Sequence, residues 1–303
     1  TFLAATQFES TDARRAFPCW DEPERKAKFD VTLLIAENLT AVSNMPVQSE
    51  HFIENGIKSV TFGTTPIMST YLLAFVVGDL ASIEKLSDSG TLMRVWTTRG
   101  KEEQGRFALE TSLELLDFYN AYFGIPFPLP KLDHLAIPDF AAGAMENWGA
   151  ITYREVALLV DPENSSAATR QIVAAIISHE MAHMWFGDLV TMKWWNDLWL
   201  NESFASWMGD KAVDAIHPEW EMWTQFLTAD TASAFSLDGL ANSHPIEQEV
   251  NNPAEIGQLF DAISYSKGGS ILRMLEDYLG PEDFRTGIGD YLETHSYLSL
   301  IHI

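Results

Sequence analysis

Two histidines and two glutamates within residues 171–207 have the spacing of a catalytic zinc site. His179, Glu180 and His183 form the pattern H-E-x-x-H, and Glu202 follows after eighteen intervening residues. Residues four apart share one face of a helix, so both imidazoles can reach one metal ion. Glu202 offers an anionic third ligand from a second helix. Three such ligands with an open fourth position are typical of a catalytic zinc ion rather than a structural one.

This ligand set predicts amide hydrolysis. Zinc held by two neutral imidazoles and one carboxylate keeps a net positive charge, lowers the pKa of a water molecule toward ~7 and polarises a carbonyl group. Glu180 is not a ligand, so we expect it to take the proton of the water and to pass it to the leaving amine. In the structural alternative, the two histidines are core residues with satisfied hydrogen bonds, and Glu202 pairs with a surface lysine.

Helices are predicted to position these residues. The first is expected to begin near Ser165 or Ser166, either of which can be its N-cap, and Gly187 suits its C-terminus. The second is expected from about Leu198 to Asp214 and would carry Glu202.

Two further helices are predicted after these. In the region of residues 218–230, Trp220, Trp223 and Leu227 have helical spacing, which we interpret as core packing. The last clear helix is expected to begin near Tyr265 and to end at Gly280-Pro281.

The N-terminal part of the chain is predicted to be β-structure. Short β-rich runs divided by Asn, Gly and Pro extend to about residue 82, and Asn55-Gly56 predicts a hairpin turn. An amphipathic helix is expected over residues 100–124. We place the domain boundary within Ala81–Gly90.

The composition excludes some classes of partner. There are 19 basic and 43 acidic residues, and the resulting net charge of −24 disfavours nucleic acid and anionic membrane surfaces. No apolar run approaches the ~18 residues of a membrane span. Cys19 is the only cysteine, which favours a reducing, cytoplasmic location. The chain opens on strand-like sequence without Met, so we expect a truncated N-terminus.

Four separated motifs resemble the gluzincin zinc aminopeptidases of the aminopeptidase N and puromycin-sensitive type. One is H-E-x-x-H with a glutamate after eighteen residues, and another is G-A-M-E-N at residues 143–147. The third is TQFE at residues 6–9, followed by DARRAFPCWDEP, and the fourth is DAISYSKG at residues 261–268. The likeness covers nearly the whole chain.

The resemblance implies an α+β fold with two domains: the C-terminal part of a β-sandwich (1–82) and a thermolysin-like catalytic domain (83–303). It also implies that family members have further strands before this sequence and a helical domain after it. The final LSLIHI departs from the family pattern.

The resemblance also implies the roles of individual residues. His179, His183 and Glu202 would bind one Zn²⁺, Glu180 would be the general base, and Tyr265 would donate a hydrogen bond to the oxyanion. Substrate-binding roles fall on a second group: Gln7, Glu9, Gly143, Ala144, Met145 and Glu146.

Within this second group, Glu146 would bind the free α-ammonium of a peptide, helped by Glu9 and by Glu202. Gln7 and Met145 would line the pocket for the first side chain. The backbone of Gly143 and Ala144 would pair with the peptide. Because consecutive Cα atoms lie 3.8 Å apart, only one residue fits between this clamp and the metal. Peptides with a free N-terminal amine are therefore the expected substrates.

Two alternatives stay open. An endopeptidase or an epoxide hydrolase can use the same scaffold, and a silent peptide-binding module can keep it without catalysis. His134, His217 and His244 lack ligand spacing, and we expect them to be structural. The preferred N-terminal residue and the oligomeric state are not predicted.

Overall fold

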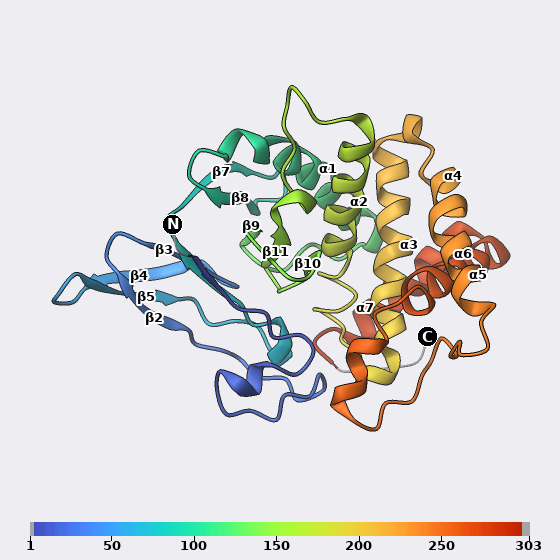
Figure 1. Ribbon diagram of the computed structural model, residues 1–303, viewed down its shortest axis with the longest axis horizontal. Coiled ribbons are helices and arrows are strands. Elements are labelled where there is room, and N and C mark those ends of the chain that lie inside the picture. Colours follow the sequence, from blue (N-terminus) through green and yellow to red (C-terminus); the bar gives the residue numbers. More distant parts are fainter. Residues whose placement is uncertain (1–2, 299–303) are drawn as a thin grey trace. The chain divides into compact units, whose positions relative to one another are not determined.

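The computed structural model describes residues 3–298 and confirms the predicted α+β class (Figure 1). The strands are β1 (Leu3–Ala5), β2 (Thr32–Ala36), β3 (Thr40–Ser43), β4 (Val47–Phe52), β5 (Ile57–Phe62), β6 (Phe75–Gly78), β7 (Leu80–Leu86), β8 (Leu92–Thr98), β9 (Lys131–Ile137), β10 (Ala144–Met145) and β11 (Ala150–Arg154). The helices are α1 (Arg106–Phe123), α2 (Ala167–Ala182), α3 (Leu198–Ile216), α4 (Met222–Phe226), α5 (Ala232–Asp238), α6 (Gly268–Leu279) and α7 (Pro281–His295). Of the unexpected tail LSLIHI, residues 299–303 lie outside the described part.

The chain forms two compact units, which we describe separately. Unit 1 consists of Thr1–Asp21, Arg25–Leu113 and Phe127–Ile177, and unit 2 of Glu22–Glu24, Glu114–Pro126 and Ser178–Ile303. The division into domains at residues 82 and 83 stays a prediction.

Two three-stranded sheets in unit 1 share one apolar core. Their strand orders are β1-β6-β3 and β2-β5-β4. Ile35 and Val60 of one sheet form a buried cluster with Ala41 of the other, as expected of a sandwich. The predicted hairpin turn joins β4 to β5, where Asn55 and Gly56 have φ values of 60° and 72°.

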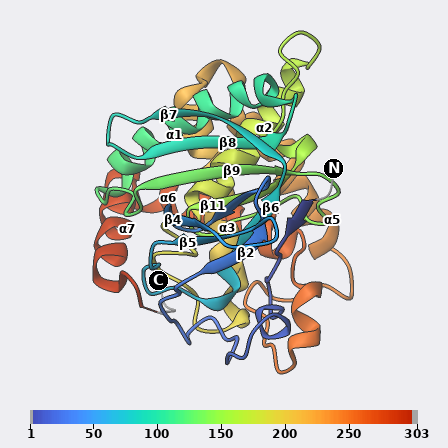
Figure 2. The same ribbon diagram turned by 90° about the vertical axis from the view of Figure 1, so that its left-hand side faces the viewer.

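A mixed five-stranded sheet completes unit 1, with the order β10-β11-β9-β8-β7. Figure 2 shows β7, β8, β9 and β11 in this succession. β9 is parallel to both of its neighbours, whereas β10 and β7 pair antiparallel at the two edges. All seven residues of β9 are buried, as is typical of a central strand.

Unit 2 is helical, and α3 packs in it against α6 and the turn before α6. The helix expected from Tyr265 begins instead at Gly268, because residues Ile263–Lys267 form a wider π-helical turn. The amide of Lys267 accordingly binds the carbonyl of Ala262, five residues back. The helix α7, which begins at Pro281, was not predicted.

We predicted that Trp220, Trp223 and Leu227 form the core-facing side of the third helix, and this prediction was wrong. Met222 and Phe226 are buried, whereas Leu227 is 57% exposed. Glu221 takes a left-handed conformation with φ 49° and ψ 51° and separates α4 from the preceding turn that contains Trp220. Trp220 therefore lies outside α4, and Leu227 begins the π-helical turn Leu227–Thr231, so the three predicted residues do not share one helical face.

Among residues 3–298, none of the helices is both long enough and apolar enough to span a bilayer.

Candidate metal centre

The helix α2 presents the two histidines of the H-E-x-x-H pattern. Ser166 is its N-cap, as predicted, because its hydroxyl accepts a hydrogen bond of 3.1 Å from the amide of Thr169. The helix ends at Ala182, before Gly187, because the backbone then tightens into i→i−3 hydrogen bonds. The amide of His183 still binds the carbonyl of His179, so both rings project from one face.

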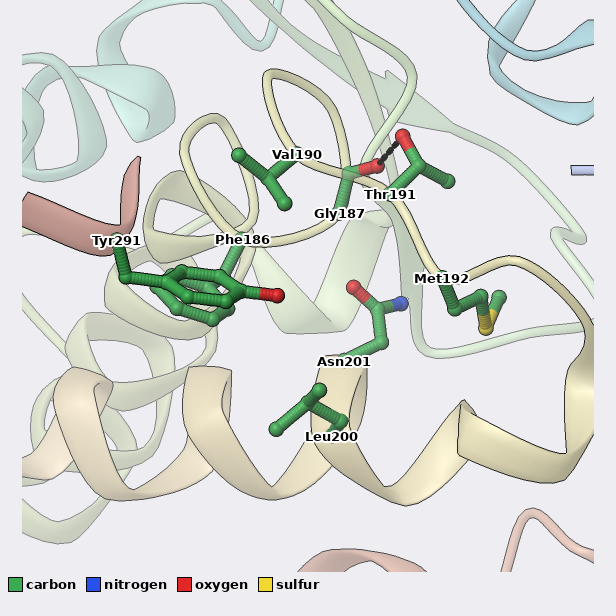
Figure 3. A pocket seen from close by; sticks show the side chains of 8 residues that line it. All are labelled: Phe186, Gly187, Val190, Thr191, Met192, Leu200, Asn201 and Tyr291. Atoms are coloured by element: carbon green, nitrogen blue, oxygen red, sulfur yellow. Dashed lines mark hydrogen bonds between the residues drawn. The ribbon is translucent and has the colours of Figure 1, made fainter. Parts of the chain in front are cut away.

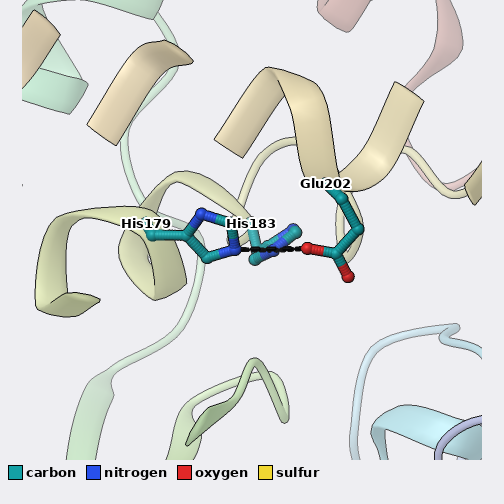
Figure 4. A group of neighbouring side chains, drawn as sticks. All are labelled: His179, His183 and Glu202. Atoms are coloured by element: carbon teal, nitrogen blue, oxygen red, sulfur yellow. Dashed lines mark hydrogen bonds and ion pairs between the residues drawn. The ribbon is translucent and has the colours of Figure 1, made fainter. Parts of the chain in front are cut away.

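The three predicted ligands converge in unit 2, as Figure 4 shows. The Nε2 atoms of His179 and His183 lie 3.0 Å apart. An oxygen of Glu202, from α3, lies 3.2 Å from the first and 3.5 Å from the second. Ligand atoms about 2.0–2.1 Å from a tetrahedral zinc ion are separated by about 3.3–3.4 Å. The donor set and its spacing therefore fit a zinc ion.

Hydrogen bonding fixes the tautomer of His183. Its Nδ1 lies 2.9 Å from the carbonyl oxygen of Phe186 and 3.0 Å from the side-chain oxygen of Asn201. Both atoms accept, so Nδ1 carries the proton. In the neutral ring, Nε2 is then an acceptor that faces the carboxylate of Glu202. Two facing acceptors repel each other, and a bound cation removes the repulsion.

Gly187 and Asn201 pack closely behind His183. Figure 3 shows the side chain of Asn201 rising from α3 toward the loop that contains Gly187. Gly187 has a φ of +137°, and a β-carbon there would lie 3.1 Å from Nδ1 of His183. The adjoining cavity of about 10 Å³ holds about one water molecule at most. The structure thus leaves little freedom to the ring.

His179 is held by α3 and by an aromatic neighbour. Its Nδ1 lies 3.3 Å from the hydroxyl of Ser206, and its ring stacks on Tyr265 with centroids 6.0 Å apart. A β-carbon on Gly209 would lie 3.0 Å from the backbone nitrogen of His179. A small residue at this position is therefore what allows α3 to approach α2 so closely.

The surroundings of Glu202 favour the ionised form of its carboxyl group. Burial raises the pKa of its carboxyl group, but the adjacent rings of His179 and His183 outweigh burial and lower the pKa to about 2. Glu180, the predicted general base, is also buried on α2 beside His179. The site therefore places two carboxylates on adjacent helices.

Hydrogen bonds hold the residues on both sides of Tyr265. The hydroxyl of Ser203, next to Glu202, donates a hydrogen bond of 2.5 Å to the carbonyl of Ser264. The hydroxyl of Ser266 donates to Asp230 over 2.9 Å. Tyr265 is therefore tied to α3 through its neighbours. Three supporting residues were not predicted from the sequence, although all lie within four residues of Glu202: Asn201, Ser203 and Ser206.

The predicted substrate-binding residues belong to unit 1. The side-chain amide of Gln7 lies 3.2 Å from the sulfur of Met145, so residues 138 apart in sequence meet. Met145 and Ala144 form the edge strand β10, and Glu146 follows it as a buried carboxylate. The placement of this group at the metal centre stays a prediction.

The three histidines that we expected to be structural, His134, His217 and His244, pair with nearby side chains. Buried His134 bonds through Nδ1 to the hydroxyl of Tyr153 over 3.0 Å, and burial lowers its pKa to about 4. His217 stacks on Trp220, and His244 bonds to Asp261.

Comparison with known proteins identifies the family. The profile of the peptidase family M1 domain matches residues 107–302, and that of the peptidase M1 N-terminal domain matches residues 1–72. Aminopeptidase M1-D of Oryza sativa subsp. japonica is 54% identical over 295 residues, which are 97% of this chain and 34% of that protein.

Two other relatives are similarly close. Aminopeptidase M1 of Arabidopsis thaliana is 52% identical over 97% of this chain and 33% of its own length. Puromycin-sensitive aminopeptidase of Caenorhabditis elegans is 53% identical over 99% of this chain and 32% of its own length. The chain thus spans about a third of the relatives that it matches. It belongs to peptidase family M1, which confirms the resemblance to the gluzincin zinc aminopeptidases.

Proposed function

We infer that this chain carries the catalytic centre of a zinc aminopeptidase, which removes the N-terminal residue from peptides. The observation that carries this proposal is the convergence of His179, His183 and Glu202 at mutual distances of 3.0–3.5 Å. When bound there, zinc supplies a Lewis acid that activates water and polarises the scissile carbonyl. The membership in peptidase family M1 supports the same reaction class.

Glu180 acts as the general base in this proposal. It takes a proton from the attacking water and gives it to the departing amine, so that the peptide bond is hydrolysed without a net change at the carboxylate. Its position next to His179 on α2 supports this role. Tyr265, stacked on His179, donates its hydroxyl hydrogen to the oxygen that becomes negative in the transition state.

The substrate-binding residues of unit 1 select the chain end. Glu146 and Glu9 bind the α-ammonium group, with Glu202 contributing, while Gln7 and Met145 line the pocket for the first side chain. The contact between Gln7 and Met145 supports the proposal that both side chains line the same pocket. Among the described strands, β10 lies at the edge of its sheet, and an edge strand can pair with an extended peptide through residues such as Gly143 and Ala144.

The proposal is tested with a panel of aminoacyl fluorogenic substrates. Each substrate is assayed with the full-length native protein, with and without a zinc chelator. We expect turnover that the chelator abolishes and added zinc restores. The matched N-acetylated substrates should not be cleaved, because acetylation removes the charge that Glu146 and Glu9 bind. Cleavage of blocked peptides would favour the endopeptidase, and binding without any cleavage would favour the silent module. The cytoplasmic location stays a prediction, since one relative is named as mitochondrial.

A further inference from the structure

The loop between α5 and the turn that carries Tyr265 contains a half-buried histidine, His244. Its Nε2 lies 2.8 Å from a carboxylate oxygen of Asp261, and its Nδ1 lies 2.7 Å from the carbonyl oxygen of Pro245. Both partners are acceptors, so the protonated ring donates to both at once, whereas the neutral ring donates to one of them. The ring therefore links two separate stretches of backbone.

Asp261 connects His244 to the segment that contains Tyr265. Its other oxygen accepts hydrogen bonds from the amides of Ile263 and Ser264, over 2.8 Å and 3.1 Å. Its backbone carbonyl accepts from the amide of Tyr265 over 3.0 Å. Asp261 thus caps the turn on which Tyr265 lies, and the rotamer that permits capping also points one oxygen at His244.

The loop is anchored at its other end to the segment that precedes α3. The indole of Trp194 donates to the carbonyl of Val250 over 2.9 Å, and the amide of Val250 donates to Asn196 over 2.8 Å. The same loop therefore touches the beginning of the metal-binding helix and the cap of the turn with Tyr265. A connection of this kind can keep two parts of a catalytic centre in register.

We propose that His244 is a positioning residue, which acts through Asp261 to hold the turn that presents Tyr265. This inference rests on the proposed function, since it assumes that the hydroxyl of Tyr265 acts in the reaction. The hydrogen bond from Nε2 to Asp261 is the one that matters, and the bond from Nδ1 to Pro245 only fixes the loop.

Two nearly isosteric substitutions separate the two bonds. His244→Gln can place an amide donor near the position of Nε2, whereas His244→Asn places one near Nδ1 and does not reach Asp261. We expect H244N to lower kcat about 10-fold or more with little change in KM, because a small displacement of a catalytic group is costly. H244Q should recover most of kcat, and His217→Asn is the matched control. Equal kcat values for H244N and H244Q would overturn the proposal.

A measurement that needs neither metal nor turnover tests the same link. Amide hydrogen exchange at Ile263 and Ser264 should be faster in H244N than in H244Q, in metal-free as well as zinc-loaded full-length protein. Unchanged exchange in H244N would overturn the proposal.

Tyr265→Phe separates the role of Tyr265 from that of His244. If Y265F keeps full activity, the proposed role of Tyr265 fails. If Y265F is impaired but H244N is not, only the role of His244 fails. If both are impaired, H244N should cause little further loss in the Y265F background, because both changes act on one group.

Discussion

A β-carbon added to Gly187 would lie 2.6 Å from the side-chain oxygen of Asn201, the atom that binds Nδ1 of His183. The φ of +137° at Gly187 also disfavours any other residue. The loop after α2 and the helix α3 therefore meet at a glycine, and this contact orients the ring of His183.

The first prediction concerns this contact. Gly187→Ala should displace Asn201 and turn the ring of His183, which lowers the affinity for zinc about 10- to 100-fold. Competition with a chromophoric chelator measures the change. Gly287→Ala is the matched control, since a β-carbon on Gly287 would point into open space. Equal zinc affinity in G187A and the control would show that Asn201 does not orient the ligand.

The second prediction separates the base from the metal. Glu180→Gln keeps the size of the side chain but removes its basicity, so turnover of an aminoacyl amide should fall about 10²–10⁴-fold. Metal analysis should still find about one zinc ion per chain, because Glu180 is not among the three converging ligands. Glu219→Gln, a change on the surface of unit 2, is the control. Loss of zinc from E180Q would instead make Glu180 a ligand.

The proximity of His179 and His183 could be predicted from the sequence because it depends on local geometry. His179 and His183 lie on one helix, and the periodicity of a helix fixes which positions share a face. Ser166 as N-cap and the turn at Asn55-Gly56 were predictable for the same reason, since each needs only a few neighbouring residues.

Contacts between distant segments were not predictable in this way. Gln7 meets Met145 across 138 positions, and His244 meets Asp261 across an irregular loop. The predicted buried face of the third helix failed because Glu221 interrupts the helix and a π-helical turn begins at Leu227, and a periodicity taken from the sequence extends through such breaks. Tertiary packing decides features of this kind.

The third prediction concerns a buried ion pair in unit 1. Lys131 donates to Asp133 over 2.6 Å and to the carbonyls of Ser43 and Gly149 over 2.6 Å and 2.7 Å. Removal of the cation takes one donor from each of these buried acceptors and leaves the Asp133 carboxylate, among the described residues, with Arg94 as its only paired cation. Lys131→Met should therefore reduce the free energy of unfolding by about 3–5 kcal/mol.

Urea unfolding measures this change, and Lys101→Met is its control. Lys101 pairs with Glu155 over 2.7 Å, but its side chain is 40% exposed, so its loss should cost only about 0–1 kcal/mol. If K131M and K101M proved equally stable, the buried contacts of Lys131 would contribute no more than a surface pair.

The fourth prediction is a dependence of stability on pH that arises from Asp210 on α3. Burial raises the pKa of its carboxyl group to about 7, and the nearby charges of Asp230 and Asp214 add to the shift. The folded protein then binds a proton that the unfolded chain releases above its ordinary pKa of 3.8. The destabilising effect of Asp210 is therefore absent below pH 3.8, grows as the pH rises and levels off above pH 7.

Asp210→Asn removes this ionisation, so the variant should gain stability relative to the native protein as the pH rises from about 4 to about 8. The gain should reach about 2–4 kcal/mol, since one pKa unit corresponds to about 1.4 kcal/mol. Unfolding by urea at several pH values measures it, and Asp290→Asn, on the exposed face of α7, is the control for loss of a carboxylate. A difference between D210N and the native protein that does not change with pH would contradict the raised pKa, because only a group that titrates differently in the two states links stability to pH.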